Sequence, residues 1–101
     1  MAVTFSALAE PHRREILELL RGGELPVGDL VDRLGLSQPA VSKHLRVLRD
    51  AGLVEVRPEG QRRLYRLQPA PLAELDEWLA PFRALWGRSL DRLGQHLEDN
   101  P

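Results

Sequence analysis

The sequence contains no cysteine, few aromatic residues and no long apolar run. The lack of cysteine excludes disulfides, thiolate metal sites and cysteine nucleophiles. No apolar run approaches the roughly 20 residues that a membrane-spanning helix needs, and no signal peptide is recognisable. We therefore expect a cytoplasmic protein, associated with the nucleoid if it binds DNA, that has no membrane partner.

The chain also lacks an overall charge excess, because its 101 residues sum to a net charge of −1. The charge is distributed unevenly, with seven basic and three acidic residues in residues 37–67 and an acidic excess on both sides. A basic segment of this kind favours a local polyanion-binding face, although a solvated surface is the alternative. The length suits one domain, residues 1–101, with one modest core.

Enzymatic chemistry finds little support in the residues. His12, His44 and His96 lie in three separate predicted elements, and neither a glycine-rich phosphate loop nor a nucleophile motif is present. His44 borders the core side of its helix, which favours a hydrogen-bonded structural role. We therefore predict that the protein is not an enzyme and has no cofactor.

Two short helices with clear ends follow each other in the first half of the chain. Apolar residues at 27, 30, 31 and 34 form one face of a helix that ends at Gly35. Ser37 is a suitable N-cap for the next helix, about 38–51, and Gly52 a suitable left-handed residue after its end. A leading helix and a helix from Pro11 to the Gly22-Gly23 pair precede them. The pair at about 27–51 predicts a helix-turn-helix.

The second helix of this pair has residues that packing does not explain. Val41, Leu45 and Leu48 form its core stripe, while its other face carries hydrogen-bond donors and cations. Gln pairs with adenine, and Lys or Arg with guanine, in the major groove. The outward residues are Gln38, Ser42, Lys43, Arg46 and Arg49. A charged, solvated surface helix is the simpler alternative, but the neighbouring elements favour DNA recognition.

A basic hairpin is predicted at about 53–67. Residues 53–57 and 63–67 alternate apolar and polar, and Pro58-Glu59-Gly60-Gln61 supplies a turn. Arg62 and Arg63 flank the turn, where a wing contacts phosphates or enters the minor groove. Arg57 and Arg66 are expected on the sheet surface, and Tyr65 is expected to pack against the helices.

A long amphipathic helix, about 71–98, is expected to close the chain and to kink near Pro81. Its aromatic residues, together with Phe5, predict a dimer interface. The predicted interface comprises Phe5, Leu75, Trp78, Leu79, Phe82, Trp86, Leu90 and Leu93. Packing on the helix's own domain and a pocket for a small apolar ligand remain open alternatives.

The segments "ALAEPHRREILELL", "LVDRLGLSQPAVSKHLRVLRDAGLVEVR" and "GQRRLYRL" resemble the ArsR family of bacterial winged-helix repressors over residues 4–67. The resemblance implies a mainly α fold with a small β-hairpin, and a homodimer that binds a palindromic operator in double-stranded DNA and represses transcription. It implies base contacts around Gln38, Ser42 and Lys43, and phosphate contacts from Ser37, Arg46 and the wing. The full set of expected DNA contacts is Ser37, Gln38, Pro39, Ser42, Lys43, Arg46, Arg49, Arg62 and Arg63.

One departure from the family concerns metal. Pro26 and Gly28 stand where metal-sensing members carry cysteines, and His96 with Glu98 and Asp99 is a poor substitute for the family's second site. The resemblance therefore implies a member without metal, many of which repress their own operon. A protein–protein adaptor, a metal-responsive sensor with a non-cysteine site, and activation instead of repression remain alternatives, and no small-molecule effector is identified.

Overall fold

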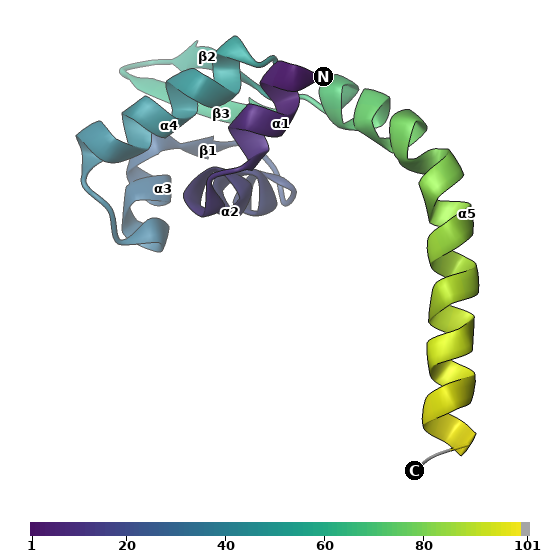
Figure 1. Ribbon diagram of the computed structural model, residues 1–101. Helices are drawn as coiled ribbons and strands as arrows, with labels where there is room; N and C mark the ends of the chain where they lie inside the picture. The colour runs from purple at the N-terminus through teal and green to yellow at the C-terminus, as the bar shows by residue number, and fades with distance from the viewer. Residues whose placement is uncertain (100–101) are drawn as a thin grey trace.

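The computed structural model describes the backbone of residues 1–99 and the side chains of residues 1–88. Four short helices pack together with a small sheet at one side of them, and a long helix leaves this body (Figure 1). The elements in chain order are α1 (Ala2–Leu8), α2 (Pro11–Leu20), β1 (Leu25–Pro26), α3 (Val27–Leu34), α4 (Gln38–Asp50), β2 (Val54–Glu59), β3 (Arg62–Leu67) and α5 (Ala70–Asp99). This mainly helical fold with a small sheet confirms the predicted fold class.

Local sequence signals explain where the first helices begin and end. Pro11 occupies the first turn of α2, where a missing N–H costs no hydrogen bond. The carboxylate of Glu10 caps the same helix by accepting a hydrogen bond from the Arg13 N–H at 3.0 Å. Helix α3 ends at Gly35, whose φ of 66° lies in the left-handed region that favours glycine.

One face of each of the helices α1 to α4 builds a single core together with the start of the sheet. Ile16, Leu30 and Leu48 are fully buried there, each on a different helix. Leu53 and Val54 extend the same cluster into the sheet. Burying these side chains fixes how α4 is turned, because its apolar stripe has to face inward.

The sheet has three antiparallel strands in the order β1-β3-β2. The predicted hairpin is present, but the prediction of only two strands was incomplete, since Leu25 of β1 pairs with Tyr65 of β3. A two-residue strand that ends in proline shows no alternation from which to predict it. The turn is also tighter than predicted, because the strands reach Glu59 and Arg62 and leave only Gly60 and Gln61 between them. Gly60 has a φ of 62°, as a two-residue hairpin turn requires.

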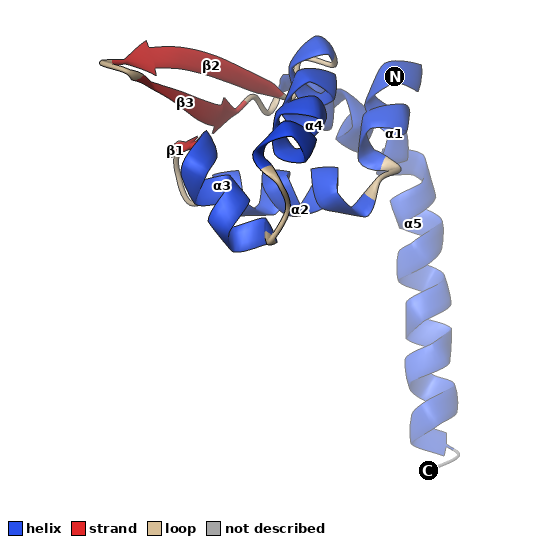
Figure 2. Ribbon diagram, turned by 90° about the vertical axis from the view of Figure 1, so that its left-hand side faces the viewer, coloured by secondary structure: helices blue, strands red, loops and turns tan. Residues whose placement is uncertain are grey.

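Helix α5 extends away from the body as an arm (Figures 1 and 2). The radius of gyration is 17.7 Å, whereas a compact domain of this length has about 13 Å. Pro81 lies inside α5 and does not split it, but Figure 1 shows that the helix bends in its green part. The Arg83 side chain connects the parts of α5 before and after Pro81. It donates a hydrogen bond to the Asp76 carbonyl oxygen at 3.1 Å and pairs with the Asp76 carboxylate. Among the described residues, no helix combines the length and apolar character needed to cross a bilayer.

Candidate nucleic-acid interface

Helix α4 presents the polar face that the sequence predicts. Val41, Leu45 and Leu48 have exposed fractions of 0%, 1% and 0%, so the opposite side of the helix has to face solvent. The five residues predicted on that side are all exposed: Gln38, Ser42, Lys43, Arg46 and Arg49. Ser37 and Pro39, at the start of the helix, are exposed as well.

Both ends of α4 are held by hydrogen bonds. The Ser37 Oγ accepts from the Ala40 N–H at 3.3 Å, so this hydroxyl caps the helix and keeps its own hydrogen for another acceptor. At the other end, the Leu53 N–H donates to the Leu48 carbonyl and the Gly52 N–H to the Arg49 carbonyl, each at 2.9 Å. These two bonds form a Schellman ending, as predicted. Well-capped ends give the exposed face a defined position relative to the core.

The hairpin formed by β2 and β3 lies beside α4, and its tip projects beyond the helices (Figure 2). A groove of about 610 Å³ separates its outer end from the first turns of α4 and the start of α3. The groove is lined by Pro26, Val27, Gly28, Asp29, Gln38, Ser42, Gln61, Arg62, Arg63 and Tyr65. A second hollow of about 220 Å³ continues along α4 and is lined by Ser42, Leu45, Arg46, Arg49, Arg63 and Tyr65. The tertiary structure thus brings predicted residues of the helix and the wing to one concave surface.

Sequence reasoning missed part of this surface. Tyr65 packs partly against the core, as expected, but it also lines both hollows beside Arg63. The alternation of strand residues could have indicated this, because residues 63 and 65 share one face of β3. Gln61 and the first residues of α3 also line the groove, and no local pattern places them next to α4.

The arginines of the hairpin divide into two kinds. Arg57 donates to Glu24 at 3.0 and 3.2 Å from its Nε, and Arg66 donates to Glu55 at 2.9 Å. Both therefore serve the sheet surface, as predicted. Arg62 lies 3.5 Å from the Glu59 carboxylate in an exposed pair that is easily exchanged for another anion. Arg63 is exposed and lines both hollows.

The ion pair between Glu24 and Arg57 predicts a pH dependence of stability. Hydrogen bonds from Arg57 hold the pKa of the Glu24 carboxyl below its ordinary value of 4.5, despite the opposing effect of burial. A lowered folded-state pKa contributes stability that is present above about pH 4.5 and is lost as the pH falls through the folded value. We expect Glu24→Gln to lower the free energy of unfolding slightly at pH 7 and to have a smaller effect near pH 3, because protonation of the carboxyl weakens the pair. Urea unfolding at both pH values measures this.

The Arg57→Gln variant is the matched control for this pair. It should show the same loss at pH 7, and the double variant should lose no more than either single variant. Equal effects of Glu24→Gln at pH 7 and pH 3 would contradict a role for the charge.

Four of the predicted dimer residues form an exposed apolar strip on α1 and α5. Phe5, Trp78, Phe82 and Trp86 have exposed fractions between 41% and 50%, and Leu85, which the sequence reading left out, reaches 51%. The Phe5 and Trp78 ring centroids lie 5.6 Å apart, and those of Trp78 and Phe82 lie 4.9 Å apart. Of the other predicted residues, Leu75 and Leu79 are half-buried, while Leu90 and Leu93 lie outside the described side chains.

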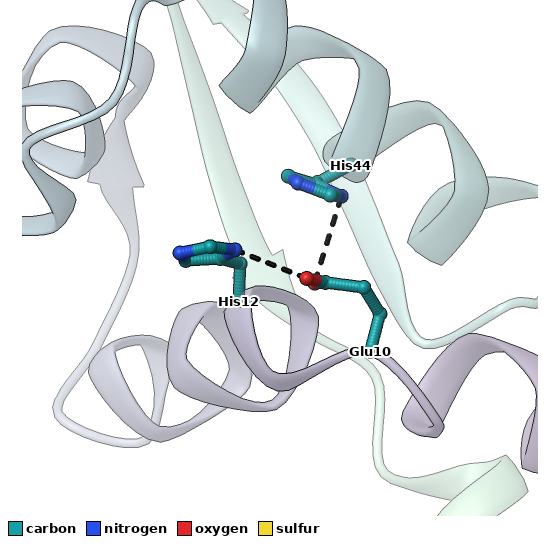
Figure 3. A group of neighbouring side chains, drawn as sticks. All are labelled: Glu10, His12 and His44. Atoms are coloured by element: carbon teal, nitrogen blue, oxygen red, sulfur yellow. Dashed lines mark hydrogen bonds and ion pairs between the residues drawn. The ribbon is translucent and has the colours of Figure 1, made fainter.

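The three histidines lie in three separate elements, as predicted, but two of them meet in the tertiary structure. His12 of α2 and His44 of α4 come together around Glu10, with ring centroids 5.8 Å apart (Figure 3). His44 was expected to be hydrogen-bonded, but within the part of the chain whose side chains are described its buried Nδ1 has no hydrogen-bond partner. Although burial raises the pKa of the Glu10 carboxyl, hydrogen bonds from the Arg13 N–H and from His12 hold this pKa below its usual value. His96, with Glu98 and Asp99, lies outside the described side chains.

Comparisons with known proteins agree with this geometry. Residues 10–56 match the family described as "Bacterial regulatory protein, arsR family". The "HTH-type transcriptional regulator Rv2034" of Mycobacterium tuberculosis is 46% identical over 94 residues, which cover 93% of this chain and 85% of that protein. The "Transcriptional repressor SdpR" of Bacillus subtilis is 35% identical over 78 residues, which cover 77% of this chain and 87% of that protein.

The fold is also similar to solved structures. The "ArsR-like Transcriptional Regulator from Rhodococcus sp. RHA1" superposes with a TM-score of 0.72 at 35% identity, covering 93% of this chain and 89% of that one. The similarity therefore extends beyond the helix-turn-helix to most of the chain.

Proposed function

The chain belongs to the ArsR family of bacterial regulatory proteins, and from this premise we propose that it is a homodimeric repressor of a palindromic operator. Members of this family are DNA-binding transcriptional regulators, so the chain is a regulator and not an enzyme. The observation that carries the proposal is the exposed donor-rich face of α4, which shares one groove with the arginines of the wing. Because its target is the bacterial chromosome, the protein acts in the cytoplasm.

The residues of the interface take different roles in this proposal. Gln38, Ser42 and Lys43 lie in the first turns of α4, the part of a recognition helix that reaches base edges in the major groove. The residues that hold phosphates are Ser37, Arg46, Arg49, Arg62 and Arg63. Pro39 has no N–H to donate and contacts the DNA backbone by van der Waals packing. The start of α4 thus selects the DNA sequence, and the phosphate contacts of the remaining residues position the protein on the duplex.

The exposed strip on α1 and α5 supplies the dimer in this proposal. Aromatic residues as exposed as Trp78 and Trp86 are unusual on a monomer and usual at the centre of an interface. A two-fold axis through this strip would direct two copies of α4 toward successive major grooves, about 34 Å apart. The operator would then be a palindrome.

Replacing the adenine-reading side chain tests the base contacts. We expect Gln38→Ala to reduce the preference for a selected operator over random duplex by about 5- to 150-fold, because a bidentate contact contributes about 1–3 kcal/mol of discrimination. Ser42→Ala should act in the same direction with a smaller effect. Binding of each variant to the operator selected from a random DNA pool, and to a scrambled duplex of equal length, measures the ratio.

Binding of the parent protein to the operator and to the scrambled duplex decides whether the repressor proposal holds. If it binds operator and scrambled duplex equally, the repressor proposal fails. If it binds neither, the protein–protein adaptor takes its place. Transcription from a promoter that carries the operator then separates repression from activation.

Replacing an arginine of the wing should have a different effect from replacing a base-contacting residue. We expect Arg63→Ala to weaken binding to operator and to scrambled duplex by the same factor, since a phosphate contact carries no sequence information. The slope of log K against log salt should become shallower by about 0.9, the value for one lost phosphate contact. Titrations at three salt concentrations measure this slope.

Arg62→Ala should weaken binding to both duplexes in the same way, because its exposed pair with Glu59 is easily exchanged for a phosphate. Arg21→Ala, an exposed arginine after α2, is the matched control and should leave the slope unchanged. A sequence-dependent loss in Arg63→Ala would assign this residue to base reading instead.

A further inference from the structure

A cluster of three side chains lies at the corner between α1 and α2, on the side that faces α4. Glu10 and His12 come from the start of α2, and His44 comes from the middle of α4 (Figure 3). The carboxylate of Glu10 points between the two imidazole rings. All three residues are half-buried, which leaves one side of the cluster open to solvent.

The distances in the cluster approach those of a metal site. His12 Nδ1 lies 3.0 Å from Glu10 Oε1, and His44 Nδ1 lies 3.9 Å from Glu10 Oε2. One ligand atom from each of the three residues lies within 4.8 Å of the other two. Neighbouring ligand atoms of a tetrahedral zinc ion, with bonds of about 2.0–2.1 Å, lie about 3.3 Å apart. Small side-chain rotations would therefore bring the three atoms to this spacing.

The buried Nδ1 of His44 is a second, independent sign of a ligand. The atom is inaccessible to water, has no hydrogen-bond partner among the described residues and faces a carboxylate. A buried polar atom without a partner is costly, and such an atom in a native structure calls for an unseen ion or water. A metal ion between this nitrogen and Glu10 would satisfy both groups.

We propose that Glu10, His12 and His44 bind one divalent transition-metal ion of the zinc class, with water completing its coordination. Two imidazoles and one carboxylate suit zinc, cobalt and nickel, and three protein ligands leave one position open for water. The lone pairs on Nδ1 bind the ion, so both rings carry their hydrogen on Nε2. Binding therefore displaces the hydrogen that His12 Nδ1 now donates to Glu10.

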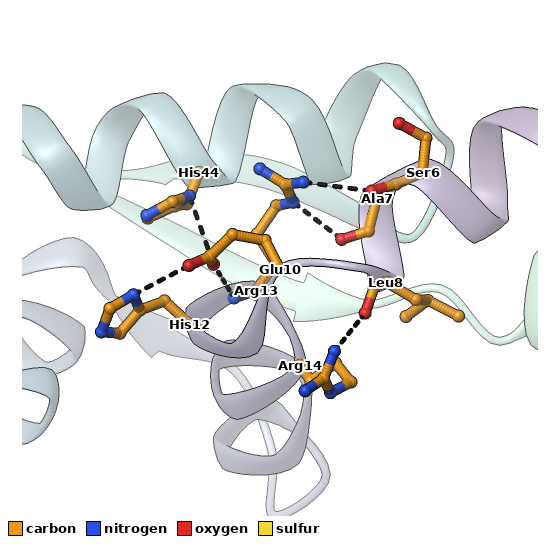
Figure 4. A network of polar contacts seen from close by, with 8 residues as sticks. All are labelled: Ser6, Ala7, Leu8, Glu10, His12, Arg13, Arg14 and His44. Atoms are coloured by element: carbon orange, nitrogen blue, oxygen red, sulfur yellow. Dashed lines mark hydrogen bonds and ion pairs between the residues drawn. The ribbon is translucent and has the colours of Figure 1, made fainter.

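The surroundings hold this site in place. The Arg13 N–H donates to Glu10 Oε2 at 3.0 Å and orients the carboxylate from behind, as outer hydrogen bonds orient metal ligands. The Arg13 side chain turns away from the cluster and donates to the carbonyl oxygens of Ala7 and Ser6 at the end of α1 (Figure 4). Arg14 donates to the Leu8 carbonyl in the same way. The corner between α1 and α2 is thus stiffened by these hydrogen bonds, and an ion there has firm support.

The position of the site gives it a regulatory consequence. His44 follows Lys43 of the DNA-facing surface, and α1 carries Phe5 of the proposed dimer interface. An ion bound by Glu10, His12 and His44 ties α4 to the α1–α2 corner, and so links the recognition helix to the dimer. We expect DNA affinity to change by about 5- to 150-fold on metal binding, the usual range of coupling between two sites. This effect rests on the proposed function, whereas metal binding itself does not.

Cobalt(II) titration of the full-length protein at fixed pH tests the site directly. The parent protein should give a visible absorption band that saturates at one Co(II) per chain and is removed by Zn(II). His12→Gln and His44→Gln should each lower the affinity for Co(II) at least 10-fold while keeping the circular dichroism of the parent. Glu10→Gln should lower it as well, since the amide still accepts from Arg13 but lacks the charge.

His96→Gln is the matched control, because His96 is the remaining histidine of the chain and belongs to α5. It should leave the cobalt band unchanged. The absence of a band in the parent, or a band lost in His96→Gln and kept in His12→Gln and His44→Gln, would overturn the proposed site.

DNA titrations with and without Zn(II) then test the coupling. The affinity of the parent should shift, and that of His12→Gln should not. An unchanged affinity in the parent overturns the coupling. If cobalt fails to bind while the operator is bound specifically, the metal inference is wrong and the proposed function stands. If cobalt binds while the operator is not bound specifically, only the proposed function is wrong.

Discussion

A Phe82→Glu variant should be monomeric and should bind the palindromic operator about 10²- to 10⁴-fold more weakly than the parent. Phe82 is exposed to 41% and packs with a tilted ring against Trp78 at the centre of the apolar strip, so a carboxylate there would be buried without a partner in the dimer. Two half-sites bound by one dimer gain affinity because the second binding event is intramolecular, and a monomer loses this gain. Sedimentation equilibrium and DNA titration measure the two effects.

The domain of this variant should stay folded, because Phe82 lies on the arm and outside the core cluster. Glu77→Gln, an exposed change on the same helix, is the control and should remain dimeric. If Phe82→Glu stays dimeric, then the strip on α1 and α5 is not the interface. If it becomes monomeric and keeps full operator affinity, the palindromic mode of binding is wrong.

Leu48→Ala should lower the free energy of unfolding by about 2–5 kcal/mol, the usual cost of removing a buried leucine side chain. Leu48 is 0% exposed and lies in the stripe that holds α4 on the core. Small domains have about 5–15 kcal/mol in total, and Tm should therefore fall by roughly 10–30 °C. Thermal and urea unfolding at one fixed protein concentration measure the change, since dimerisation makes Tm depend on concentration.

Val47→Ala is the neighbouring control on the same helix. Val47 is half-buried at the edge of the core, so its truncation should cost about 1 kcal/mol or less. Equal losses in the two variants would show that α4 is not held by the stripe that includes Leu48. Operator binding at a temperature where Leu48→Ala is partly unfolded should fall in proportion to its folded fraction.

The proposed metal site could not be predicted from the sequence. The chain has Pro26 and Gly28 where metal-sensing relatives have cysteines, and this difference led to the prediction of a member without metal. That prediction considered ligands adjacent in sequence or on the terminal helix. The cluster at Glu10 joins residues of α2 and α4 that are more than 30 positions apart, and no spacing rule finds such a set.

Much of the fold was predictable because its signals are local. The limits of α4 depend on two local signals. The Ser37 hydroxyl caps the first turn by accepting from the N–H three residues later, and Gly52 ends the helix with a hydrogen bond from its N–H to a carbonyl of the last turn. The polar face of α4 follows from the 3.6-residue period once the apolar stripe is assigned to the core. The pairing of β1 with β3 was not predictable, because two residues around Pro26 acquire strand geometry only from a partner about 40 positions away.

The sequence by itself determined the caps of α4, the chemistry of its outward face and the apolar period of α5. Each of these depends on residues within two turns of one another, where spacing alone decides which side chains share a face. Only the tertiary structure decided that Gln38 and Ser42 share a groove with the wing, that Arg57 pairs with Glu24, and that His12 meets His44. These contacts join segments that are distant in the chain, and packing of the shared core, which no local pattern encodes, brings them together.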